Sequence, residues 1–244
     1  MTRCAKATTA AVLCLGTLLA LPATGLGQAT GGTAPAPSGS GSTSSAPPAG
    51  SGVLQAGRAA LLGRLQRAAG TVAGAGGEPV LIQRSDAAAG WVTLARTTAA
   101  ADGSFAALWR ADRSGRFTLR AVVSAASAAS SGTPPPALTA PVTVYGLGMA
   151  TYYGPGFYGR RTACGPILGT RTLGVAHRTL PCGTRVEFYY RGRTLTLPVI
   201  DRGPFVRGVY WDLTAAAARI VGFTATGRGY VGAVVVGRGP VPAR

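Results

Sequence analysis

The stretch VIDRGPFVRGVYWDLTAAAARIVGF, residues 199–223, begins as an apolar strand and ends as an alanine-rich segment. Alternate residues of a strand point to the same face, and Leu197, Val199 and Asp201 fall on one parity. Gly203-Pro204 breaks the strand directly afterwards. We therefore expect Asp201 to end the apolar face of this strand, at its rim.

The second half of the same stretch predicts a short helix. Thr214 can cap its start and Gly222 can end it. Asp212 lies just before this helix, where a negative charge interacts favourably with the helix dipole. We interpret Asp212 and Thr214 as structural residues.

Four blocks in the C-terminal part, this stretch included, follow one another at short spacings. They are ATYYGPGFYGRRTACG (150–165), LGVAHRTLPCGTRV (173–186), VIDRGPFVRG (199–208) and WDLTAAAARIVGF (211–223). In order and spacing they resemble the RlpA-like double-psi β-barrel family, which includes septal-ring lytic transglycosylases and is related to expansins. The resemblance implies a six-stranded barrel with a short helix over residues 147–244, and a shallow groove that takes a glycan chain.

The resemblance also implies which residues are catalytic: Asp201 of the DRGP block and His177 of the AHRTLP block. Hydrolytic glycosidases usually need two carboxyl groups, and only Asp201 of the barrel's three acids is placed for chemistry by the pattern. A lytic transglycosylase needs one acid/base group, because the C6 hydroxyl of the sugar replaces water. Our hypothesis is that Asp201 protonates the glycosidic oxygen and then accepts the C6 hydroxyl proton, while His177 orients it or the sugar.

Both residues have a structural alternative. Asp201 could pair with an arginine or cap a turn, and His177, the single histidine, could be a hydrogen-bonded rim residue. The thirteen arginines after residue 146 should also lower the pKa of Asp201, against the needs of a general acid.

Aromatic and polar side chains near these blocks are candidates for binding the sugar chain. Aromatic rings can stack on sugar rings, although filling the end of a small barrel is an equal alternative. The predicted substrate-binding residues are Tyr152, Tyr153, Thr162, Arg202 and Phe205.

One departure from the family pattern leaves a second function open. Many active RlpA-like sequences carry an acidic residue after the TA-x-G block, and residues 164–170, CGPILGT, contain none. The primary prediction is a peptidoglycan lytic transglycosylase that leaves 1,6-anhydromuramic ends. The alternative is an expansin-like module that binds and loosens wall polysaccharide without cleavage.

The N-terminus reads as a secretory signal over residues 1–29. Arg3 and Lys6 precede an apolar run, residues 7–21, and small residues then offer a cleavage site. The run is too short to favour a membrane-spanning helix, although a retained anchor is the alternative. We expect a secreted, wall-facing protein without a stable membrane span.

Cysteine usage fits that compartment. After signal removal only Cys164 and Cys182 remain, which predicts one disulfide. A zinc site made from both thiols and His177 is the alternative, but CxxC and HxxxH spacings are absent. We predict no metal and no cofactor, since the barrel segment also lacks nucleotide-binding motifs.

The formal charge of +17 comes almost entirely from arginine. Outside the membrane, such a surface would attract anionic wall polymers in addition to peptidoglycan. Basic and aromatic residues are not interleaved as in nucleic-acid modules, so we predict no nucleic-acid partner.

The rest of the chain predicts a linker and a second β domain, making the fold class all-β. Residues 30–52 are rich in Gly, Ser, Pro and Ala and form a disordered linker. Residues 53–146 contain short β-rich runs separated by turn signals such as Asp102-Gly103, which predicts an antiparallel sandwich that resembles bacterial immunoglobulin-like modules. For residues 53–70 two strands are favoured over an amphipathic helix.

Overall fold

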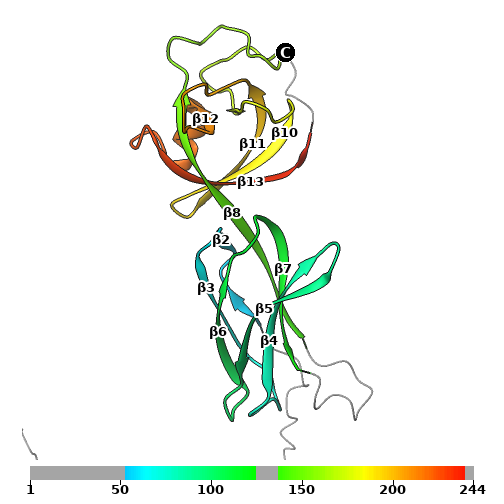
Figure 1. Ribbon diagram of the computed structural model, residues 1–244. Helices are drawn as coiled ribbons and strands as arrows, with labels where there is room; N and C mark the ends of the chain where they lie inside the picture. The colour runs from blue at the N-terminus through cyan, green and yellow to red at the C-terminus, as the bar shows by residue number, and fades with distance from the viewer. Residues whose placement is uncertain (1–52, 125–136, 240–244) are drawn as a thin grey trace, which may run out of the picture. The chain divides into compact units, whose positions relative to one another are not determined.

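A computed structural model describes residues 53–124 and 137–239 of the 244-residue chain, so the predicted signal peptide (1–29) and linker (30–52) lie outside the described residues. The described residues form strands and one short helix, as the all-β prediction requires (Figure 1). No described helix has the length and apolar character needed to cross a membrane.

The elements share one pattern, strands first and the single helix near the end. The first seven strands are β1 (Gln55–Ala56), β2 (Ala59–Leu61), β3 (Leu65–Thr71), β4 (Pro79–Asp86), β5 (Gly90–Thr98), β6 (Ser104–Arg110) and β7 (Gly115–Val123). They are followed by β8 (Ala137–Tyr153), β9 (Val175–Ala176), β10 (Thr184–Tyr190), β11 (Arg193–Asp201), β12 (Trp211–Thr214), α1 (Ala215–Val221) and β13 (Gly229–Arg238).

The N-terminal strands make two sheets around one apolar core. One sheet has the order β1-β3-β6, and in the other β5, β4 and β7 lead to β8. Trp109, Ile82, Leu119 and Leu138 are buried between them. Residues 53–70 contain β1, β2 and most of β3, so the amphipathic-helix alternative for this segment is wrong. The immunoglobulin-like assignment of this sandwich stays a prediction, as do the domain boundaries.

Strand β8, the long green strand of Figure 1, is one continuous element of 17 residues. Its first part pairs with β7 and β2, and its last part pairs with β13 and β12. The predicted boundary between residues 146 and 147 therefore falls inside a strand.

Six strands close into a ring in the C-terminal part. The hydrogen-bonded order is β12-β9-β11-β10-β13-β8, and a further pairing of β12 with β8 closes it. The β9–β11 and β12–β8 pairings are parallel and the others are antiparallel. Phe188, Leu197, Leu213 and Phe223 fill the interior, so the barrel has a packed core of its own.

Local sequence sets two turns of this barrel. Arg191 and Gly192 both have positive φ, 46° and 82°, which is the geometry of a tight two-residue hairpin between β10 and β11. Helix α1 starts at Thr214, whose hydroxyl accepts a hydrogen bond from the Ala217 N–H, and it ends at Gly222 with φ of 77°. Both helix signals were readable from the sequence.

Strand β11 differs from its predicted geometry at its end. A register shift lies between Val199, which pairs with Val175, and Asp201, which pairs with Ala176. Since neighbouring residues of β9 point to opposite faces, Asp201 points away from the face that Val199 presents to the core. The expectation that Asp201 continues the apolar face was wrong. It assumed regular alternation of side chains along the strand, and a β-bulge interrupts that alternation.

The predicted disulfide is present. Cys164 and Cys182 are bonded, with their Cα atoms 5.6 Å apart. The bond excludes the zinc alternative, which required both cysteines as thiolates.

Candidate active site

Two carboxylates lie on the strands that flank β9. Asp201 of β11 and Asp212 of β12 are both in register with Ala176. Residues in register across a sheet point to the same face, and two strand spacings separate the Cα atoms of the two aspartates by roughly 10 Å. The short strand β9 thus brings together two acids that are eleven positions apart in sequence.

Strand β8 contributes polar side chains to the same face. Thr151 is in register with Asp212, and its hydroxyl donates a hydrogen bond of 2.7 Å to Asp212 Oδ1. Tyr153, two residues further, has a buried hydroxyl without a hydrogen-bond partner among the described residues. Burial raises the pKa of Tyr153, and the negative charges of Asp201 and then Asp212 raise it further, so the hydroxyl lies close to both carboxylates.

The carboxyl group of Asp212 has a raised pKa. Burial raises the pKa of its carboxyl to about 6, the Thr151 hydrogen bond opposes this rise, and the negative charge of Asp201 adds to it. A carboxylic acid that keeps its proton near pH 6 can donate it to a leaving group.

Asp212 lies just before the helix, as the sequence predicted, but its side chain is partly buried in the barrel. It lies on β12, two residues before the Thr214 cap, and the first turn of α1 holds no acidic residue. The signal in the sequence, a carboxylate before a capped helix, is shared by structural and functional aspartates. Burial beside a second carboxylate distinguishes a functional aspartate from a structural one, and this environment is visible only in the folded structure.

Asp201 is held by backbone groups and not by a guanidinium. Its Oδ1 accepts hydrogen bonds from the Ala163 N–H (2.9 Å) and the Arg202 N–H (2.8 Å). Within residues 53–124 and 137–239, no ion pair joins Asp201 to an arginine. Two backbone donors on one oxygen therefore fix the carboxylate in position.

His177 directly follows Ala176, the residue in register with both aspartates, but its ring has other neighbours. The backbone N–H of His177 donates to the carbonyl of Asp201 at 3.2 Å, whereas the ring packs on Trp211 with centroids 4.6 Å apart. Its Nδ1 accepts hydrogen bonds from the N–H groups of Thr179 and Leu180. No described hydrogen bond joins the ring to Asp201 or Asp212.

Burial lowers the pKa of His177, and the charges of Arg202 and Arg178 lower it further. The imidazole is consequently neutral at pH 7. Because Nδ1 is an acceptor, the proton of the neutral ring is on Nε2.

Two arginines tie down the loops around the site. Arg202 donates from Nη1 to the carbonyls of His177 (3.2 Å) and Leu180 (2.9 Å). Arg178 donates to the carbonyls of Pro204, Val206 and Val209 in the loop after Asp201. Arg202 was predicted to bind substrate, and the structure engages its guanidinium with the chain itself.

The other predicted binding residues lie in different surroundings. Tyr152 packs against the barrel core, Thr162 is buried with its hydroxyl bonded to the Pro166 carbonyl, and Phe205 is 82% exposed. Only Tyr153 of the five faces the two carboxylates.

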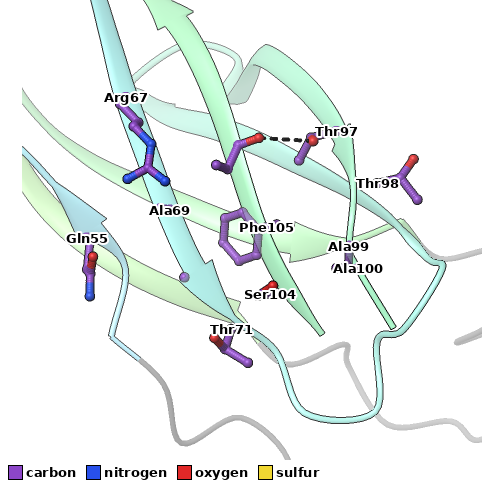
Figure 2. Close-up of a pocket in the computed structure, with 12 residues that line it drawn as sticks. Gln55, Arg67, Ala69, Thr71, Thr97, Thr98, Ala99, Ala100, Ser104 and Phe105 are labelled. Carbon is purple, nitrogen blue, oxygen red and sulfur yellow. Dashed lines mark hydrogen bonds between the residues drawn. The ribbon is translucent and has the colours of Figure 1, made fainter. Parts of the chain in front are cut away.

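The sandwich contains a pocket whose lining includes neither Asp201 nor Asp212. It has a volume of about 530 Å³ and lies where β3, β5 and β6 meet. Figure 2 shows Phe105 at its centre and the hydrogen bond from the Thr97 hydroxyl to the Ala106 carbonyl. Its lining has no carboxyl group or histidine, so it lacks acid/base chemistry.

Comparison with known proteins gives matches to the barrel segment. Residues 146–233 match a family profile described as "Lytic transglycolase". The chain is 46% identical over 91 residues to the probable endolytic peptidoglycan transglycosylase RlpA of Synechocystis sp. and 39% identical over 94 residues to the endolytic peptidoglycan transglycosylase RlpA of Campylobacter jejuni. These matches cover 36% and 38% of this chain, and only 28% and 34% of the two relatives.

Among solved structures, the Streptomyces papain inhibitor matches 36% of this chain and 92% of its own chain, with 29% identity and a TM-score of 0.30.

The ring of six strands, with its parallel and antiparallel pairings and one short helix, fits a double-psi β-barrel. The family match over residues 146–233 and the two RlpA relatives show that this part of the chain is similar to lytic transglycosylase domains.

Proposed function

We propose that the barrel is a lytic transglycosylase that cleaves peptidoglycan glycan strands, with Asp212 as the acid/base group. The names of the relatives, endolytic peptidoglycan transglycosylases, support this substrate and reaction. The observation that carries the assignment of roles is the raised pKa of Asp212, buried beside Thr151 and next to the charge of Asp201.

The reaction needs two proton transfers through one carboxyl group. Protonated Asp212 donates to the glycosidic oxygen while the bond from C1 of N-acetylmuramic acid to that oxygen breaks. The resulting carboxylate then accepts the proton of the C6 hydroxyl as O6 bonds to C1. The products are a 1,6-anhydromuramic end and a free C4 hydroxyl on N-acetylglucosamine, and Asp212 returns to its protonated form.

Asp201 has a different role in this scheme. The Ala163 and Arg202 N–H groups hold its carboxylate, and this carboxylate stabilises the positive charge that develops at C1. The sequence suggested Asp201 as the acid/base group, and this scheme gives that role to Asp212.

The missing acidic residue after Cys164 does not deprive this site of a second carboxyl group, because β12 supplies it. The site therefore has what cleavage needs, and the relatives' names favour cleavage over the expansin-like alternative. The proposed action on peptidoglycan implies a location outside the cytoplasmic membrane, and the signal peptide predicted over residues 1–29 supports the same location. Binding to anionic wall polymers stays a prediction from the charge.

Product analysis tests the proposal. The mature protein is incubated with purified peptidoglycan, and the soluble fragments are examined by mass spectrometry. We expect 1,6-anhydromuramic ends with the wild type and none with Asp212→Asn, which keeps the shape and an acceptor for Thr151. Glu187→Gln is the matched control. It removes the third carboxylate of the barrel, which lies on β10 and pairs with Thr196 and Val234 instead of Ala176. Reducing muramic ends would indicate hydrolysis instead, and binding without fragments would favour the expansin-like alternative.

A further inference from the structure

A small cavity opens beside His177, and the proposed chemistry does not use it. Its volume is about 220 Å³. Sites for drug-sized ligands are roughly 300–1,000 Å³, so this cavity suits one substituent of a longer ligand. Its lining residues come from β8, β12, β13 and the segment after β9: Gly146, Leu147, Gly148, His177, Tyr210, Trp211 and Ala233.

The lining carries no ionised group. Leu147, Tyr210 and Trp211 are apolar or aromatic, and the lowered pKa of His177 keeps its imidazole neutral. The chain as a whole is strongly basic, with a formal charge of +17, but this cavity offers an anion no counter-charge. The fitting ligand group is neutral.

Two N–H donors border the cavity and have no partner in the described part of the chain. Since His177 Nδ1 accepts two backbone hydrogen bonds, Nε2–H is the free donor of that ring. The indole of Trp211 packs on the same imidazole and provides Nε1–H as a second donor. The ligand group therefore needs an acceptor, for which a carbonyl oxygen is suited.

Gly148 sets the position of the indole. A Cβ at this residue would lie 2.7 Å from Trp211 Nε1 and 2.9 Å from Cδ1, which is too close for any side chain. Strand β8 thus leaves room for the polar edge of Trp211 at the cavity wall. The exposed side chains of Leu147 and Tyr210, 45% and 59% exposed, add apolar surface there.

We infer that this cavity, the acetamido pocket, binds the N-acetyl group of an amino sugar. The carbonyl oxygen accepts from His177 Nε2–H or Trp211 Nε1–H, and the methyl group packs against Leu147 and Tyr210. A neutral group with one acceptor and one methyl satisfies each feature of the lining. His177 is then a specificity residue for the glycan and not a proton carrier.

The pocket is adjacent to the proposed catalytic pair, and the inference rests on the proposed function for its substrate. Trp211 directly precedes Asp212, and the His177 N–H is bonded to the Asp201 carbonyl. Because neighbouring residues of a strand point to opposite faces, the pocket takes the acetamido group of a sugar other than the one whose linkage reaches the two carboxylates.

Binding can be measured without cleavage by using the Asp212→Asn protein. The probes are glycan strands freed of stem peptides, the same strands after chemical removal of the N-acetyl groups, and the de-N-acetylated strands after re-acetylation. Calorimetry at high salt, which screens the ammonium groups of the de-N-acetylated strands from the basic protein, should show at least tenfold weaker binding to these strands and full recovery on re-acetylation. Equal affinity for the first two probes would overturn the inference.

Paired variants locate the preference. His177→Gln places an amide donor near the position of Nε2 and should keep most of the preference, whereas His177→Asn retains an acceptor for the Thr179 and Leu180 N–H groups and should lose it. Tyr210→Ala should weaken the preference, and Tyr230→Ala, which removes an equally exposed aromatic outside the lining, should not. A preference that survives both His177→Asn and Tyr210→Ala contradicts the pocket.

The two proposals fail separately. If the wild type yields no anhydro products but the acetyl preference and its loss in His177→Asn are found, the pocket stands and the cleavage proposal is wrong. If products appear without any acetyl preference, the reverse holds.

Discussion

Asp201 and Asp212 are both paired with Ala176, one from each side of β9, so the two carboxyl groups share a face of the barrel without sharing a hydrogen bond. Their coupling is electrostatic: the charge of Asp201 helps to keep the proton on Asp212. The site therefore divides the acid and the anion between two strands, and the following predictions depend on that division.

Replacing Asp212 should stabilise the protein at neutral pH. Because its pKa rises from 3.8 to about 6 on folding, the proton stabilises the folded state below pH 4 and this stabilisation is lost as the pH rises through 6. Ionised Asp212 thus lowers the free energy of unfolding by about 3 kcal/mol above pH 6, which Asp212→Asn avoids. Denaturant unfolding under non-reducing conditions should show similar stability of the two proteins near pH 3.5 and a more stable variant at pH 7.5.

If the free energies of unfolding of variant and wild type differed by the same amount at both pH values, folding would not raise the pKa of Asp212. A variant less stable than wild type at pH 7.5 would show that Asp212 is held as a structural anion, as the sequence suggested.

The pH dependence of cleavage should follow Asp212. Since the acid must be protonated, kcat/KM should fall as the pH rises through about 6. Asp201→Asn removes a charge that raises this pKa, so the fall should move to lower pH, with a rate reduction on the order of a hundredfold. Rates of release of anhydro fragments at several pH values measure both effects. A profile that moves to higher pH in Asp201→Asn would contradict the coupling.

The single histidine allows a direct measurement of its own pKa. We expect NMR titration of the untagged protein to place His177 below the usual 6.5, because burial and the charges of Arg202 and Arg178 favour the neutral ring. Arg202→Gln removes one of these charges and should raise the pKa of His177. It should also reduce stability by about 1–3 kcal/mol, since the carbonyls of His177 and Leu180 lose their donor. An unchanged histidine titration would indicate that the guanidinium does not act on the ring.

Removing the disulfide should affect both stability and the site. The bond closes a loop with a sequence separation of 18 residues, so Cys164→Ser with Cys182→Ser should reduce the free energy of unfolding by about 3 kcal/mol. Ala163, which donates to Asp201, precedes Cys164, so activity should fall more than in an equally destabilised variant of the sandwich core such as Ile82→Ala. Equal activity losses in the two proteins would limit the disulfide to stability.

The parts of the fold that depend on local pattern were predictable from the sequence. The Arg191-Gly192 hairpin, the Thr214 cap and the Gly222 stop each depend on a few adjacent residues. The disulfide was predicted because only two cysteines follow the predicted signal peptide. The barrel itself was recognised by resemblance, because no local pattern encodes the pairing of β8 with β12.

The site was only partly predictable, for a physical reason. Asp201 was found through its block, but its direction depends on a register shift in β11, and the environment of Asp212 depends on Thr151 from a strand sixty residues earlier. Tyr152 and Tyr153 looked equivalent in sequence, and strand alternation sends one into the core and the other toward the carboxylates.

Carboxyl NMR tests directly whether Asp212 is the proton donor. Mature protein labelled with ¹³C at the aspartate carboxyl carbons reports on five groups, Asp86, Asp102, Asp112, Asp201 and Asp212. We predict one carboxyl that titrates near pH 6, disappears in Asp212→Asn and moves to lower pH in Asp201→Asn. If all five carboxyls titrate below pH 4.5, Asp212 is ionised at the pH of the reaction and cannot be its proton donor.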